Sequence, residues 1–249
     1  MIPAVQVTDL HYTYPDGKEA LRGVSFSIAP GECIGVVGPN GSGKSTLLLH
    51  LNGILPESPD GFSAVKINGN LISKKNITDI RKEVGLLFQD PDDQLFCPTV
   101  FEDIAFGPRQ FGFSEEAVRM SVERALAQTA LLGFENRFPY HLSSGEKRRV
   151  CLAGVLACEP QVLALDEPTS NLDPRGKRNL HAILQSLPVT KIIATHDLEM
   201  VVELCTRTMI LDEGRIIADG STVELLGNEE LMLQHGLEKP HILRHRHPH

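Results

Sequence analysis

Short, almost wholly apolar runs recur along the 249-residue chain and predict the strands of a buried sheet. They are residues 33–37, 84–88, 162–166 and 191–195. Runs of this length are typical of strands that are covered on both faces. Because strands alternate with helical segments, we expect a mostly parallel sheet with helices on both sides.

Other segments predict antiparallel strands at the two ends of the chain. Residues 5–7 and 24–28 alternate apolar and polar positions, as half-buried strands do, and residues 14–17 between them have turn chemistry. An Asn-Gly pair within residues 65–72 predicts a hairpin with a type I′ turn. A last hairpin is expected over residues 208–218.

The periodicity changes from strand to helix in the middle of the chain. Ser114 is expected to cap a helix that runs towards Leu132. Its apolar face, spaced by three and four, consists of Val118, Val122, Ala125, Leu126 and Thr129. A second helix opens with a capping box at residues 143–146 and continues to Ala157, and a short helix capped by Ser221 follows the last hairpin.

These elements predict one domain over residues 1–249. Its parts are a β subdomain with the first part of the core (1–89), a helical insertion (90–157), the rest of the core (158–236) and a flexible His-rich tail (237–249).

Composition narrows the class of protein. Apolar content of 41% and charged content of 22% are ordinary for a globular protein, and the net charge of −8 disfavours a nucleic-acid partner. Five cysteines without a Cys-x-x-Cys pair predict free thiols in a reducing compartment. With no signal peptide and no apolar run of about 18 residues, we expect a cytoplasmic protein whose membrane role, if any, depends on partner chains.

A glycine-rich segment between the strand at 33–37 and the following helix predicts a nucleotide site. It reads Gly38, Pro39, Asn40, Gly41, Ser42, Gly43, Lys44, Ser45 and Thr46. Backbone N–H groups of such a loop and the helix N-terminus bind phosphate oxygens. Lys44 is expected on the β- and γ-phosphates, Ser45 on Mg²⁺ and Thr46 near the α-phosphate. A chance match to the pattern has odds of about 1% in a chain of this composition.

Polar residues stand at the carboxyl ends of the other buried strands, where ligands of such sheets bind. Asp166 is expected to ligate Mg²⁺ through water and Glu167 to polarise the attacking water, although strand-end acids can also cap Thr169 or Ser170. Gln89 has two interpretations, a contact to metal or water and a plain turn residue. His196 is either a γ-phosphate donor or a structural hydrogen-bonder. The ring of Tyr14 either packs at a strand end or stacks on a base.

The order of these segments resembles that of ATP-binding-cassette (ABC) ATPases. Residues 38–46, Gln89, 142–146, 165–168, 170–173 and His196 correspond to the family's Walker A loop, Q-loop, signature, Walker B, D-loop and switch histidine. The resemblance implies an α/β P-loop NTPase with a mostly parallel sheet core, an N-terminal antiparallel β subdomain and a helical signature subdomain. It further implies ATP and Mg²⁺ as cofactors, ATP hydrolysis, and adenine stacked on Tyr14.

In that family two cassettes meet head to tail, and each signature helix closes over the other chain's γ-phosphate. Ser143 and Gly145 are therefore expected to bind ATP across a homodimer, or a heterodimer with a related cassette, with Asp173 linking the sites. The family usually has Leu-Ser-Gly-Gly-Gln, whereas Ser144 and Glu146 stand here. Glu146 keeps the helix cap but adds negative charge near a phosphate, and ATPase activity is still expected.

The segment after Gln89 is similar to energy-coupling factor importers. There an acidic Pro-Asp-x-Gln stretch lines a groove that grips arginines of a transmembrane coupling protein, which implies such a role for Asp92, Asp93 and Gln94. The alternative is an acidic, solvated turn. The resemblance implies a peripheral protein on the cytoplasmic face of the membrane, working with a coupling protein and a substrate-binding membrane subunit. The short C-terminus favours cobalt or nickel as solute, with a vitamin or another micronutrient as the alternative.

Other functions fit the sequence less well. A P-loop kinase would not explain residues 142–146 and 170–173, and a DNA-repair ATPase would need a long coiled coil before the signature. A non-enzymatic regulatory subunit would not need both Glu167 and His196. The last residues contain His241, His245, His247 and His249, which either chelate Ni²⁺ or form an ordinary disordered tail.

Overall fold

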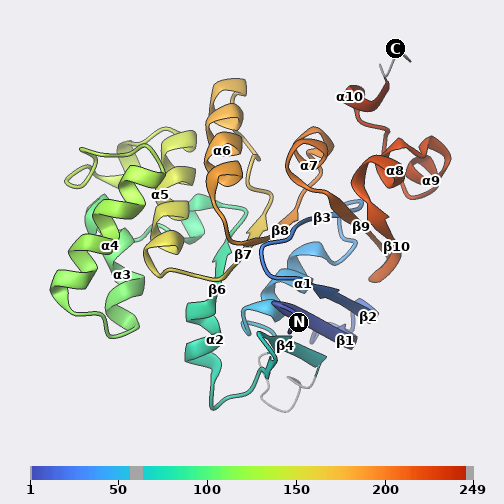
Figure 1. Cartoon of the computed structure of the whole chain (residues 1–249), viewed down its shortest axis with the longest axis horizontal. Coiled ribbons are helices and arrows are strands. Elements are labelled where there is room, and N and C mark those ends of the chain that lie inside the picture. The colour runs from blue at the N-terminus through green and yellow to red at the C-terminus, as the bar shows by residue number, and fades with distance from the viewer. Residues whose placement is uncertain (1, 57–63, 245–249) are drawn as a thin grey trace.

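The computed structural model describes residues 2–56 and 64–244 and contains two sheets (Figure 1). The larger sheet has six strands in the order β10-β9-β3-β8-β7-β6. These are β3 (Cys33–Val37), β6 (Val84–Leu87), β7 (Val162–Asp166), β8 (Thr190–Ala194), β9 (Arg207–Asp212) and β10 (Arg215–Ser221). All neighbours are parallel except β9 and β10. The expected mostly parallel α/β sheet is confirmed.

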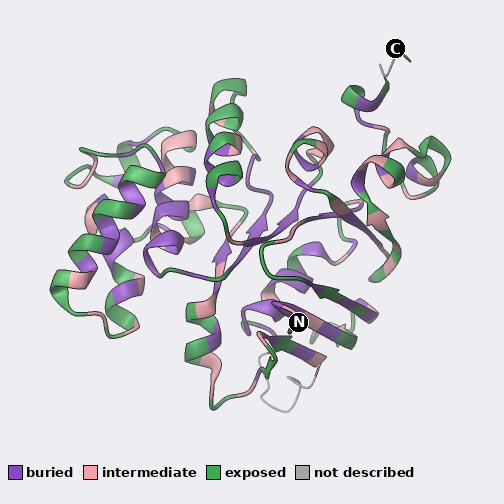
Figure 2. Ribbon diagram, viewed as in Figure 1, coloured by how far each residue is buried: buried purple, intermediate pink, exposed green. Residues whose placement is uncertain are grey.

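Helices cover both faces of this sheet. Helix α1 (Lys44–Leu51) lies on one face, and α6 (Pro174–Ser186) and α7 (Leu198–Leu204) lie on the other (Figure 1). Side chains of β7 alternate between the two cores: Val162 and Ala164 pack on the α1 side, Leu163 and Leu165 on the opposite side. Strands β7 and β8 are therefore buried along their whole length, and β3 is buried except at Cys33 (Figure 2), which explains their largely apolar sequence.

The second sheet is antiparallel, with the order β2-β1-β4-β5. Its strands are β1 (Val5–Thr13), β2 (Glu19–Ile28), β4 (Val65–Ile67) and β5 (Asn70–Leu71). The turn between β4 and β5 has φ of 48° at Asn68 and 82° at Gly69, as the predicted type I′ hairpin requires. This sheet shares its apolar core with α1, so it holds the loop before α1 from one side.

Three helices form a separate lobe next to β6: α3 (Val100–Gln110), α4 (Glu115–Gln128) and α5 (Ser144–Ala157) (Figure 1). Ser114 caps α4 by accepting from the N–H of Ala117, as expected. The helix ends at Gln128, before the predicted end at Leu132, because Ala130 adopts a left-handed φ of 54°. Helix α2 (Ile77–Glu83), which precedes β6, was not predicted.

The C-terminal segment differs from the sequence-based expectation. It contains α8 (Thr222–Gly227), α9 (Glu229–Gln234) and α10 (His241–Arg244). Ser221 occupies the N-cap position of α8, as predicted, but its side chain makes no capping hydrogen bond. The prediction of a flexible tail is wrong for residues 237–244. Leu237 and Leu243 are buried in the main core, and Glu199 accepts the N–H of His241. His245, His247 and His249 lie outside the described residues.

Two features are absent from the part of the chain that the structure describes. None of the helices in residues 2–56 and 64–244 has the length and apolar character needed to cross a membrane. The same part of the chain has no cluster of three or more His, Cys, Asp or Glu side chains arranged to hold a metal ion.

Candidate nucleotide-binding site

The glycine-rich loop connects β3 to α1, as the sequence predicts, and packing leaves no room for larger residues at two positions. A Cβ on Gly38 would lie 1.9 Å from the carbonyl oxygen of Leu211. A Cβ on Gly43 would lie 2.6 Å from the carbonyl oxygen of Ala20, and Gly43 has a φ of 107°. The loop is thus fixed between β9 and β2, with the N-terminus of α1 directly behind it.

Lys44 is folded back onto this loop. Its Nζ donates to the carbonyl oxygens of Gly38 (2.8 Å) and Pro39 (2.9 Å). Burial lowers the pKa of Lys44, while the nearby carboxylates of Glu167 and Asp166 oppose that shift. An ammonium group therefore stands in the pocket with two neutral acceptors, which anionic phosphate oxygens can replace.

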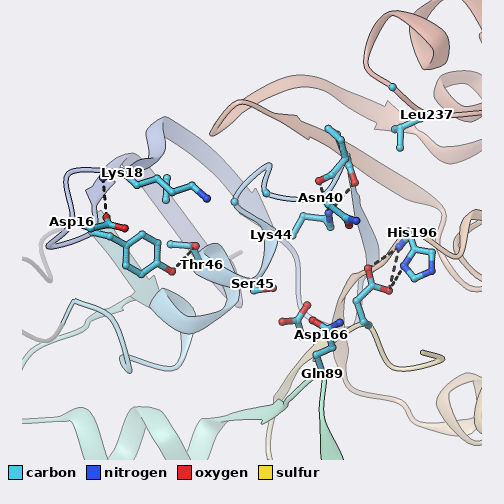
Figure 3. A pocket seen from close by; sticks show the side chains of 18 residues that line it. Asp16, Lys18, Asn40, Lys44, Ser45, Thr46, Gln89, Asp166, His196 and Leu237 are labelled. Carbon is cyan, nitrogen blue, oxygen red and sulfur yellow. Dashed lines mark hydrogen bonds and ion pairs between the residues drawn. The ribbon is translucent and has the colours of Figure 1, made fainter. Parts of the chain in front are cut away.

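Asp166 lies at the end of β7, beside Ser45 and Gln89 below the loop (Figure 3). Burial raises the pKa of Asp166 against the influence of the Ser45 hydroxyl, and the charge of Glu167 raises it further. Its buried Oδ1 has no hydrogen-bond partner within the described part of the chain. An unpaired carboxylate oxygen beside a hydroxyl is costly unless a cation neutralises it, and these oxygen donors are those that Mg²⁺ prefers. The residues fit Mg²⁺.

The carboxylate of Glu167 is fully engaged with the residues after β8. Its Oε2 accepts from the hydroxyl of Thr195 (2.9 Å) and lies 2.8 Å from Nδ1 of His196. Its Oε1 accepts the backbone N–H of His196 at 3.0 Å. Glu167 also has a left-handed φ of 44°. Glu167 and His196, for which the sequence predicted separate roles, thus form one hydrogen-bonded pair.

Tyr14 lines the same pocket. Its hydroxyl is 2.9 Å from Oγ1 of Thr46, and its ring meets that of Tyr12 edge-on at 4.9 Å. The predicted packing role at the strand end is confirmed by these contacts. Stacking on a base stays a prediction.

Most of the residues predicted to bind the nucleotide line one cavity of about 850 Å³. From the sequence-based set it is lined by Tyr14, Gly38, Pro39, Asn40, Gly41, Gly43, Lys44, Ser45, Thr46, Gln89, Asp166, Glu167 and His196. Ser42 is buried and does not line it. Asp16, Lys18 and Leu237 line it as well (Figure 3) and were missed. Leu237 had no signal in the sequence because only the packed C-terminal segment brings it there.

Ser143, Gly145 and Asp173 line a different cavity, of about 480 Å³. The predicted capping box is present: Oγ of Ser143 accepts the N–H of Glu146, and Glu146 accepts the N–H of Ser143 at 2.8 Å. Hydrogen bonds from Ser143 lower the pKa of Glu146, so its charge is held inside the cap. Arg149 and Arg175 add two guanidinium groups to the wall. The cavity suits an anion despite the Glu146 substitution in the signature.

The segment after Gln89 borders a third, mainly apolar groove of about 350 Å³. Gln94, Phe96, Asp103 and Phe106 are among its lining residues, and the two phenylalanine rings meet edge-on at 4.9 Å. Asp92 and Asp93 do not line it. The carboxylate of Asp92 instead bonds to Nζ of Lys147 at 2.6 Å, a pairing that the sequence did not suggest.

Comparison with known proteins explains why these segments occur together. Residues 21–170 match the sequence model of the ABC transporter family. This chain belongs to the ABC transporter family. A putative ABC transporter ATP-binding protein of Gloeobacter violaceus is 51% identical over 96% of this chain and 98% of its own length. An energy-coupling factor transporter ATP-binding protein, EcfA, of Carboxydothermus hydrogenoformans is 45% identical over 97% of this chain and 89% of its own length.

Solved structures agree with this ABC assignment. CbiO1 from Clostridium perfringens, described as part of the ABC transporter complex cbiONQ, superposes with a TM-score of 0.81 at 37% identity and 98% coverage of both chains. The ATP-binding cassette MJ0796, solved as a dimer bound to ADP and Pi, gives a TM-score of 0.76 at 26% identity over 88% of this chain and 98% of its own. The predicted fold and the resemblance to energy-coupling factor ATP-binding proteins are confirmed, and the chain is an ATP-binding ABC ATPase.

Proposed function

We propose that this ABC cassette works in pairs as a Mg²⁺-dependent ATPase that drives solute uptake through separate membrane subunits. The observation that carries the proposal is the separation of its two anion-binding walls. The cavity with Lys44 and the cavity with Ser143 share no lining residue in the described part of the chain. A second chain can supply the missing wall to each nucleotide.

The surroundings of Gly145 support a partner across the signature. A Cβ at Gly145 would meet no atom closer than 3.9 Å, the distance to a methyl group of Leu172. Packing within the chain therefore does not require glycine there. Close approach of an external group, such as a phosphate bound by another cassette, supplies a reason. Asp173 caps α6 by accepting the N–H of Gly176 at 2.6 Å and borders the same cavity, where it can connect the two sites.

Within each composite site the chain's own residues divide the work. Lys44 and the loop N–H groups bind the phosphates, while Ser143 and Gly145 of the other chain approach the γ-phosphate. Ser45, Asp166 and Gln89 would hold Mg²⁺, which would neutralise charge on the phosphates. Glu167 orients and deprotonates water after His196 turns its ring towards the γ-phosphate, since both groups are engaged with each other in the present arrangement.

The apolar groove is the proposed contact with the membrane subunit. Phe96 is 60% exposed and Phe106 43%, and buried Oδ2 of Asp103 has no partner within the described residues. A helix end with apolar side chains and an arginine matches this chemistry, because guanidinium bonds to carboxylate are strong in partly desolvated sites. Asp93 and Gln94 remain proposed contacts. The chain then sits on the cytoplasmic face of the membrane, next to a coupling protein and a substrate-binding subunit.

Cobalt or nickel ions are the proposed solute, with a vitamin or another micronutrient as the alternative. The proposal is supported by residues 173–176, Asp-Pro-Arg-Gly, which resemble the cobalt and nickel branch of the energy-coupling factor cassettes. Uptake of labelled Co²⁺ or Ni²⁺ by cells that express the cassette with its membrane subunits should depend on Lys44. Uptake of another solute, without either metal, would select the alternative.

Co-purification tests the membrane contact. The tagged cassette, expressed with the membrane proteins encoded beside it, should retain them, and Phe96→Ala should reduce the recovery several-fold while ATP hydrolysis by the isolated cassette persists. Met120→Ala is the control, because Met120 is an equally exposed apolar residue, at 65%, on α4 outside the groove. Equal recovery with both variants would contradict the assignment of the groove.

A further inference from the structure

Arg148 in α5 is among the most completely buried side chains of the protein, with 1% of its surface exposed. Its guanidinium has carbonyl partners rather than a carboxylate. Nη1 donates to the carbonyl oxygen of Phe88 at 2.6 Å, and Nη2 donates to that of Gln89. Its Nε has no partner within the described residues.

The buried charge of Arg148 is compensated only by two neutral carbonyl groups, and its presence needs an explanation. Burial lowers the pKa of Arg148, and the charges of Cys151, Asp90, Asp166 and Glu167 oppose that shift. A well-packed apolar side chain commonly stabilises a protein as well as a buried charged group does. Stability alone is therefore a weak reason for an arginine at this position.

The two carbonyl groups belong to a functional segment. Phe88 and Gln89 follow directly after β6, and Gln89 lines the nucleotide cavity. Arg148 itself lies in the first turns of the helix that begins beside Ser143 and Gly145. Arg148 thus connects Gln89, which faces the chain's own nucleotide, to α5, which faces the nucleotide of the partner chain.

The side chains of Gln94 and Lys147 connect the same two segments. Oε1 of Gln94 accepts the N–H of Phe88 at 3.4 Å, and its Nε2 donates to the carbonyl oxygen of Cys151 at 3.2 Å. Lys147 bonds to Asp92 on the surface. Hydrogen bonds therefore hold residues 88–94 against α5, and Arg148 makes the most deeply buried of these contacts.

We propose that Arg148 is a positioning residue that fixes Gln89 relative to the signature helix, so that contact of α5 with one nucleotide sets Gln89 at the other. This inference depends on the proposed pairing of cassettes and on the proposed contact of Gln89 with Mg²⁺ or water. Arg148 touches neither nucleotide, and its effect on hydrolysis passes through Gln89.

A double-mutant cycle on the full chain separates positioning from general stability. Arg148→Gln, which is shorter and uncharged, should lower kcat by about 10- to 100-fold, the range expected for a displaced catalytic group, and change KM for ATP less than about twofold. In the Gln89→Ala background the same substitution should change kcat less than about twofold. Its loss in melting temperature should be equal in both backgrounds, because Gln89→Ala keeps the carbonyl group that Arg148 binds.

Two further variants serve as a fallback and as a control for this experiment. If Arg148→Gln does not fold, the cycle is run with Arg148→Lys, which keeps the charge and can reach one of the carbonyl groups. Arg207→Gln is the control for loss of a well-bonded arginine, since Arg207 binds Asp219, Glu32 and the carbonyl oxygen of Ser27 away from the site. It should lower the melting temperature and leave kcat unchanged.

The outcomes distinguish this inference from the function on which it depends. An equal fold-loss of kcat in both backgrounds, or a loss that Arg207→Gln reproduces, would overturn the positioning role of Arg148 alone. If Gln89→Ala has wild-type kcat, the role of Gln89 fails, and positioning by Arg148 fails with it. If the wild-type chain hydrolyses no ATP, the proposed function itself is wrong.

Discussion

Replacement of Glu167 by glutamine tests the proposed chemistry at the most constrained side chain of the site. The carboxylate accepts hydrogen bonds from the Thr195 hydroxyl and the His196 backbone N–H, and it lies 2.8 Å from Nδ1 of the His196 ring. Glutamine has one acceptor oxygen, so its amide group must face at least one of these donors. Shape is nearly unchanged, and nucleotide binding through Lys44 should persist.

The size of the effect follows from what the substitution removes. An amide cannot deprotonate water, and loss of a general base lowers the rate by about 10²–10⁴-fold, or roughly 3–5 kcal/mol of barrier. Loss of one charge-assisted hydrogen bond costs about 1.5–3 kcal/mol of folding stability. Glu167→Gln should therefore hydrolyse ATP very slowly at saturating substrate and melt earlier than the wild type.

Phosphate release and particle mass together provide the assay. With hydrolysis blocked, Glu167→Gln should accumulate as an ATP-bound pair of chains in size-exclusion chromatography with light scattering. Glu203→Gln is a matched control, because Glu203 also pairs with a histidine, His181 at 3.1 Å, but lies outside the nucleotide cavity. Phosphate release by Glu167→Gln within a few-fold of wild type would refute the reasoning.

Changes at three further places in the chain test other parts of the account. Tyr14→Ala should raise KM for ATP roughly 2- to 12-fold through loss of an aromatic contact, while Tyr14→Phe keeps the ring and should stay near wild type; equal KM values in an ATP titration would exclude base stacking. Burial raises the pKa of Asp197, but hydrogen bonds from Lys177, the Met200 N–H and Thr169 outweigh it and lower the pKa overall. Its stabilisation is then present above the unfolded pKa of about 3.9 and is lost below it, so the difference in melting temperature between Asp197→Asn and wild type should shrink as pH falls below 4; a constant difference would contradict this. Deletion of residues 241–249 removes buried Leu243 and should lower the melting temperature without changing phosphate release, whereas loss of hydrolysis would show that α10 supports the site.

The parts of the fold that the sequence predicted are those set by local rules. The buried strands have apolar sequences because both faces are covered, and the loop before α1 has glycines where Gly38 and Gly43 approach other backbone. The capping box at Ser143 needs only residues three apart in sequence. Each of these features has a short local sequence pattern, so the sequence alone predicts it even where, as at Gly38 and Gly43, the physical reason is a contact with a distant segment.

The features that were missed depend on contacts between distant segments. The C-terminal residues have no periodicity, yet Leu237 and Leu243 pack into the main core. Arg148 reads as one of several basic residues on an exposed helix start, and only the structure places it against residues 60 positions away. The pairing of Glu167 with His196 likewise needs β7 and β8 to be neighbours.

Phosphate release by a mixture of two inactive variants tests the central claim that two cassettes share each nucleotide. Lys44→Ala removes the phosphate contact in one cavity, and Ser143→Arg blocks the other, so neither variant should release phosphate alone. An equimolar mixture should recover a substantial fraction of wild-type phosphate release, because one mixed pair contains one intact Lys44–Ser143 site. A mixture that stays as inactive as its components would contradict the account.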